Sequence, residues 1–62
     1  MTIGTKVKCI NPISVYKNEV GVVVGIDKAY IPPITVIFEK DNNLIPDLAL
    51  RFFYQNELEE IK

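Results

Sequence analysis

Apolar and polar residues alternate with a period of two in several short segments of the chain, which is the pattern of half-buried β-strands. In residues 6–10, Val7 and Cys9 point to one side, which is therefore apolar. Lys6 and Lys8 point to the other side, which is therefore basic. Similar alternation predicts further strands at residues 20–26 and 34–39. We also expect a strand at residues 48–53 and a last brief strand near the C-terminus.

The segment 20–26 is the clearest strand in the sequence. One face carries Val20, Val22, Val24 and Ile26, and the other carries Gly21, Val23 and Gly25. A glycine within a strand usually marks a bulge or a place where another backbone approaches closely. We therefore expect bends at Gly21 and Gly25.

The segment 34–39 follows two prolines. Pro33 has no N–H to donate to a ladder, so we expect it to lie directly before the strand. The alternation places Ile34, Val36 and Phe38 inward and Thr35, Ile37 and Glu39 outward.

Loops of mixed composition separate the strands. Residues 41–43 predict a turn, and residues 46–47 close the same long loop. Residues 54–57 are too polar for a core strand. Short strands joined by such loops favour an all-β fold, a small five-stranded antiparallel SH3-like barrel that forms a single domain over residues 1–62. An open meander is the alternative, and a partner would have to cover its edges.

The composition narrows the class of protein. With 62 residues there is room for one domain, and Ile, Val and Thr are abundant, as strands prefer. A domain of this size without a disulfide has a free energy of unfolding of only about a few kcal/mol, so we expect a partner to stabilise it. The longest purely apolar runs, such as Val22 to Val24, are too short to cross a bilayer.

Residues that could perform chemistry are scarce. There is no His, so Ser14 and Cys9 have no imidazole to activate them, and we do not expect an enzyme. Cys9 alternates with Val7 on the apolar face, which favours a buried, inert thiol over a redox thiol. No Gly-rich loop precedes a helix, which argues against a nucleotide site.

Two acidic segments could be considered as cation sites. Glu57, Glu59 and Glu60 lie near the C-terminus, and residues 41–43 are rich in Asp and Asn. Neither has the ligand spacing and turn glycine of a calcium loop. We interpret the first as a solvated acidic face and the second as a plain turn, and we expect no metal and no cofactor.

Charge is distributed unevenly along the chain. Residues 1–17 contain three lysines, Lys6, Lys8 and Lys17, and no acidic residue, although the net charge of the chain is −1. A basic face could steer an acidic protein partner, and ordinary solubility is the alternative interpretation.

Four segments in order resemble the PsaE family, the small stromal subunit IV of photosystem I. They are residues 4–8, the segment with Pro12, Ser14, Tyr16, Val20, Gly21, Val23 and Asp27, residues 32–40, and residues 53–58. The resemblance spans nearly the whole chain.

The resemblance implies a barrel without a cofactor on the stromal or cytoplasmic side of the thylakoid membrane, in a plastid or cyanobacterium. It would touch PsaA, PsaB and PsaC, with PsaD as a further candidate, and would assist docking of ferredoxin or flavodoxin in photosynthetic electron transport. Membrane association would come only through the complex. Because Met1 stands directly before the domain, we expect no import presequence. We assign partner binding to Lys6, Lys8, Tyr16, Lys17 and Ile37.

Two departures from the family bear on docking. Ile37 occupies the place of an arginine associated with ferredoxin docking, and Asn11 replaces a second basic residue. A lysine elsewhere would replace the arginine only as a point charge. We expect a mainly architectural subunit with weakened docking.

Two other kinds of barrel are alternatives. One is a nucleic-acid-binding barrel of the ribosomal or transcription type, which the net charge of −1 argues against, so no nucleic acid is expected. The other is a ferredoxin-docking barrel from another photosynthetic complex.

Overall fold

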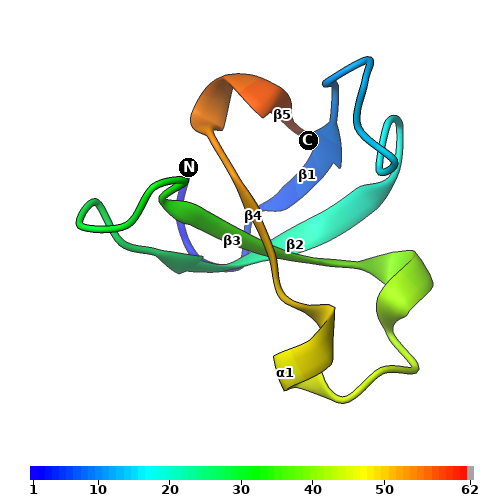
Figure 1. The fold of residues 1–62 in the computed structure, drawn as a ribbon. Helices are drawn as coiled ribbons and strands as arrows, with labels where there is room; N and C mark the ends of the chain where they lie inside the picture. Colours follow the sequence, from blue (N-terminus) through cyan, green and yellow to red (C-terminus); the bar gives the residue numbers. More distant parts are fainter. Residues whose placement is uncertain (62) are drawn as a thin grey trace.

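Five antiparallel strands form one sheet in the order β4-β3-β2-β1-β5 in the computed structural model, which describes residues 1–61 (Figure 1). The strands are β1 (Lys6–Cys9), β2 (Val20–Ile26), β3 (Ile34–Phe38), β4 (Arg51–Phe53) and β5 (Leu58–Glu60). Three single-turn helices lie between them: η1 (Glu39–Asp41), α1 (Pro46–Ala49) and η2 (Gln55–Glu57). The predicted all-β fold, a small five-stranded antiparallel barrel of SH3-like strand order, is confirmed.

The core lies on the concave side of this sheet. Its buried residues form one cluster: Val7, Cys9, Val23, Ile34, Val36, Phe38, Phe53 and Leu58. The inward positions predicted for β1 and β3 are therefore confirmed, and Cys9 is fully buried. In β2 the face with Gly21 and Val23 is the buried one, so the face richer in aliphatic residues points outward.

The two glycines of β2 have different roles. The pairing of β2 with β3 shifts register between Val23 and Gly25, so Gly25 lies at a bulge. Gly21 lies at a close approach, because a Cβ there would come 2.6 Å from the carbonyl oxygen of Ile37. Pro33 directly precedes β3, as predicted.

The prediction of a strand over residues 48–53 is wrong in its first half. Pro46 begins the helix α1, where a fixed φ and a missing N–H do no harm, and Leu48 lies within it. Leu50 returns to extended backbone, so β4 begins only at Arg51. Glu39 likewise starts η1 rather than ending β3.

The predicted turn at residues 41–43 is partly helical. Asp41 is the last residue of η1, and Asn42 caps it by donating its N–H to the carbonyl oxygen of Glu39. The polar residues after β4 form the single turn η2, which directly precedes the last strand, β5. No helix in the described range 1–61 is long and apolar enough to cross a membrane.

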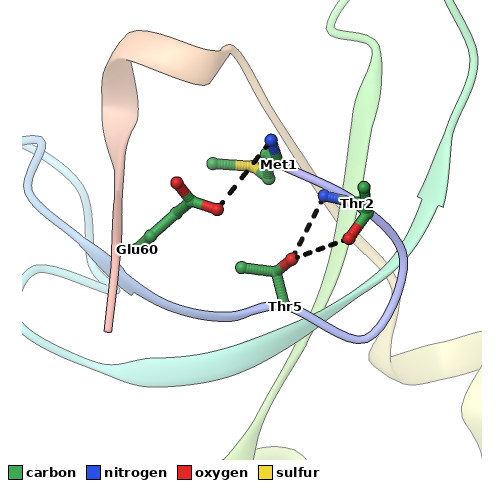
Figure 2. Close-up of polar contacts among 4 residues, drawn as sticks. All are labelled: Met1, Thr2, Thr5 and Glu60. Atoms are coloured by element: carbon green, nitrogen blue, oxygen red, sulfur yellow. Dashed lines mark hydrogen bonds and ion pairs between the residues drawn. The ribbon is translucent and has the colours of Figure 1, made fainter. Parts of the chain in front are cut away.

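The N-terminal segment is fastened to β5 and β2, the two neighbours of β1 in the sheet. Figure 2 shows the amino group of Met1 facing the Glu60 carboxylate, at 3.8 Å, and the backbone of Thr2 facing the Thr5 hydroxyl, at 3.1 Å. Gly4 donates its N–H to the carbonyl oxygen of Val23. The Met1 side chain packs against the core, so the segment covers part of the core.

Candidate docking surface

Three of the five residues predicted to bind a partner, Lys6, Lys8 and Ile37, lie on the outer face of the sheet. Lys6 pairs with Val22, and Val22 pairs with Ile37 on its other side, so these three residues form one row across β1, β2 and β3. Directly opposed residues in an antiparallel pair share a face. Lys8 lies two residues further along β1 on the same face, opposite Val20.

The middle of this outer face is apolar. Val20, Val22 and Ile37 are half-buried, although they point away from the core. Ile37 therefore faces outward, as predicted. We call the set Lys6, Lys8, Val20, Val22 and Ile37 the outer-face patch.

Both lysines of the outer-face patch have acidic neighbours. Lys6 Nζ lies 3.6 Å from the Oε2 atom of Glu39, and both side chains are more than half exposed. An exposed pair of this kind contributes little to stability, so Lys6 can exchange Glu39 for a partner's carboxylate at small cost. Lys8 lies opposite Glu59 in the pairing of β1 with β5. The patch is therefore close to electrically balanced.

Tyr16 has a different environment. Its ring stacks on Phe38 with 4.4 Å between ring centroids and meets Phe53 edge-on. Its hydroxyl accepts a hydrogen bond from Arg51 Nε at 2.6 Å and donates one to Asp41 Oδ2 at 2.9 Å. Tyr16 thus joins the loop before β2 to η1 and β4, which is a structural role.

Lys17 also lies outside the row. It is exposed in the loop between β1 and β2, where its backbone N–H donates to the carbonyl oxygen of Ser14. The next residue, Asn18, has a positive φ of 66° and turns the chain back toward β2. No strand pairing includes Lys17, so the structure does not place it with Lys6 and Lys8.

The acidic residues near the C-terminus do not form one solvated face. Glu57 accepts hydrogen bonds from the Asn11 side chain at 2.8 Å and from the backbone of Tyr54 at 2.8 Å. It therefore fastens η2 to the start of the loop after β1. Glu59 and Glu60 are exposed, as predicted. Among residues 1–61 no group of three His, Cys, Asp or Glu side chains is placed to hold a metal ion.

Sequence reasoning missed a second surface feature. A cavity of about 470 Å³ opens between the loop after β2 and strand β4, and its walls include Tyr30, Pro32 and Phe52. Tyr30 and Phe52 are 68% and 55% exposed. The two prolines predicted a loop after β2. The sequence could not predict that Phe52 lies beside this loop, because its position depends on the pairing of Phe52 in β4 with Thr35 in β3.

No protein-family model matches the chain, and no curated protein matches it either.

Proposed function

We propose that this chain is a peripheral, non-catalytic subunit that docks on a larger protein assembly, and that the assembly is the acceptor side of photosystem I. The resemblance of four segments to PsaE supports the choice of assembly. The row of Lys6, Val22 and Ile37 on the outer face is the observation that carries the docking role.

The free energy falls when a second surface covers exposed aliphatic side chains on a sheet face, because their apolar area is removed from water. The outer-face patch has the composition of a typical interface, since Val22 and Ile37 supply an apolar centre and two lysines form part of a polar rim. Strand pairing fixes the backbone that carries these side chains, so little backbone conformational entropy is lost when the patch is covered.

The charge balance of the outer-face patch favours an architectural role over strong docking of ferredoxin. Glu39 and Glu59 neighbour the two lysines, so the patch offers little net attraction to an acidic carrier. Ile37 adds no cation where the family has an arginine. Stabilisation of the acceptor side is therefore the main role proposed, and ferredoxin or flavodoxin docking is weak.

The first prediction concerns rebinding of the purified chain to photosystem I particles stripped of their peripheral stromal subunits. We expect stoichiometric rebinding, and we expect Ile37→Glu to weaken it by about tenfold or more, because a charge would enter the centre of the interface. Ile13→Glu is the control, since Ile13 is 90% exposed in the loop after β1. Sedimentation of the particles with labelled chain measures both.

Circular dichroism checks that each variant is folded, and Ile37→Thr replaces the charged variant if it unfolds. Failure of the unaltered chain to bind the particles would remove photosystem I as the assembly. Equal binding by the Ile37 and Ile13 variants would remove the outer-face patch as the docking surface. A second-order rate of ferredoxin reduction that is unchanged by the chain at several salt concentrations would confine its role to architecture.

A further inference from the structure

The cavity between the loop after β2 and strand β4 has the size and lining of a ligand site. Its volume of about 470 Å³ falls within the range of pockets that bury a drug-sized ligand or a few residues of a peptide. The cavity is a feature separate from the outer-face patch, because it shares no lining residue with it.

Four of the nine residues that line the cavity carry rings. Tyr30 and Phe52 contribute aromatic rings, and Pro32 and Pro33 contribute pyrrolidine rings. Aromatic rings expose large apolar surface at low conformational entropy cost, and they are frequent anchors of binding sites. The surface is therefore suited to ring-shaped or aliphatic groups.

The loop that forms one wall is held in place before any ligand arrives. Asp27 donates its backbone N–H to the carbonyl oxygen of Pro33 at 2.9 Å, and Tyr30 donates its N–H to the carbonyl oxygen of Asp27 at 3.0 Å. Ala29 donates its N–H to Asp27 Oδ1 at 2.9 Å. Two prolines further restrict the backbone. Figure 1 shows this loop as the green segment at the left, between β2 and β3. A fixed wall reduces the entropy cost of binding.

The charge of the lining selects the ligand. Asp27 contributes the one ionised side chain among the residues that line the cavity, and it is exposed. A ligand with a cation next to its apolar part would therefore be favoured, and an acidic ligand would be repelled.

We propose that this cavity binds an extended, proline-containing segment of a partner protein that also carries an arginine or lysine. Aromatic-lined grooves bind proline-rich segments because the polyproline II helix is preformed and places its rings against the aromatic walls. The proline rings pack on Tyr30 and Phe52, and the basic side chain approaches the carboxylate of Asp27. The test of this binding uses the purified chain and a peptide, so its outcome does not depend on the proposed association with photosystem I.

The floor of the cavity offers a way to close it without unfolding the protein. Gly25 and Thr35 line the cavity, and a Cβ at Gly25 would meet the Thr35 side chain at 3.5 Å, an ordinary contact. The Cβ of Gly25→Val therefore fits there at ordinary contact distance, and its two methyl groups add further bulk. Phe52→Ala removes a wall instead, at a residue that is more than half exposed.

The second prediction is tested by fluorescence anisotropy with a labelled nonapeptide of prolines and two arginines. We expect saturable binding at low salt, a loss of about tenfold in Phe52→Ala and a loss of about two- to fivefold in Asp27→Asn. Gly25→Val should abolish binding, and Ile13→Ala should leave it unchanged. A matched peptide with glutamates in place of the arginines should bind at least a few times more weakly.

Three results would overturn the proposal. The arginine peptide could fail to bind at low salt up to millimolar concentration, or it could bind Phe52→Ala and Gly25→Val as it binds the unaltered chain. Binding of indole, with no binding of the peptide, would assign the cavity to a flat small molecule instead. Circular dichroism spectra of the variants establish that losses of binding are not losses of fold.

Discussion

Gly21 shows how one residue can set the shape of the barrel. A Cβ at this position would lie 2.6 Å from the carbonyl oxygen of Ile37, 2.8 Å from Val36 Cγ1 and 3.0 Å from Phe38 Cα. Two of these three atoms belong to the backbone of β3, which cannot move without breaking its pairing with β2. Strands β2 and β3 can therefore pack this closely only with glycine at position 21.

The third prediction compares two glycines of the same strand. We expect Gly21→Ala to lower the free energy of unfolding by about 2–3 kcal/mol, because the added methyl group overpacks the core. Gly25→Ala should be neutral or should stabilise by up to about 1 kcal/mol, since its Cβ has room and the unfolded chain loses freedom. Urea denaturation followed by circular dichroism measures both.

The test is whether Gly21→Ala lowers the free energy of unfolding while Gly25→Ala does not. Equal shifts of the two denaturation midpoints, with unchanged slopes, would mean that the close approach at Gly21 relaxes at no cost.

Alternation along the chain predicted the inward residues of β1 and β3 but could not choose the buried face of β2. Aliphatic content alone favours the face with Val22 and Val24, yet that face points outward. The choice depends on how closely β3 approaches Gly21, and this contact joins residues more than a dozen positions apart. A sequence reading based on local period has no access to such a contact.

At the scale of elements, Tyr16 joins segments that are remote in sequence. Its ring packs on Phe38 and Phe53, and its hydroxyl connects Arg51 of β4 with Asp41 of η1. Lys40 Nζ lies 4.6 Å from the ring centroid, so a cation is placed over its face. The loop between β1 and β2 is thereby fixed to η1 and β4.

The fourth prediction separates the ring of Tyr16 from its hydroxyl. Tyr16→Phe should cost about 1 kcal/mol, because two hydrogen bonds to charged groups are lost at a half-buried site. Tyr16→Ala should cost about 3 kcal/mol, because the stacking on Phe38 is lost as well. Tyr30→Phe is the control, since the Tyr30 side chain is 68% exposed. Thermal unfolding measures all three.

An equal cost for Tyr16→Phe and Tyr30→Phe would show that the hydroxyl network contributes nothing. Hydrogen exchange of the backbone amides between residues 10 and 19 gives a second readout, because loss of the network should speed exchange in that loop most.

The elements that the sequence mispredicted have a common cause. Residues 48–50 are three apolar residues in a row and were predicted as strand, yet Pro46 starts a helical turn that includes Leu48 and Ala49. In a run of three residues the periods of helix and strand cannot be told apart. The cavity escaped prediction for a related reason, since the pairing of Thr35 with Phe52 forms only in the folded sheet.

The whole molecule has one small core and many exposed apolar side chains. The core cluster holds eight residues, whereas Ile31, Ile45 and Leu48 are each more than 60% exposed. Domains of this length bury only about 60% of the surface of the unfolded chain and are marginally stable. Any ligand that covers part of the exposed surface should therefore change the stability of the molecule visibly.

The fifth prediction uses this marginal stability to examine the cavity. A ligand present at about 100 times its Kd stabilises the folded state by about 2.7 kcal/mol, which raises Tm by about 10–20 °C in a domain of this size. The arginine peptide should produce such a shift in the unaltered chain and in Ile13→Ala. The Tm of Gly25→Val should be the same at every peptide concentration, because the variant does not bind the peptide. If instead its Tm rises with peptide as the unaltered chain's does, the peptide binds elsewhere on the exposed apolar surface, and the ring-lined cavity is not its site.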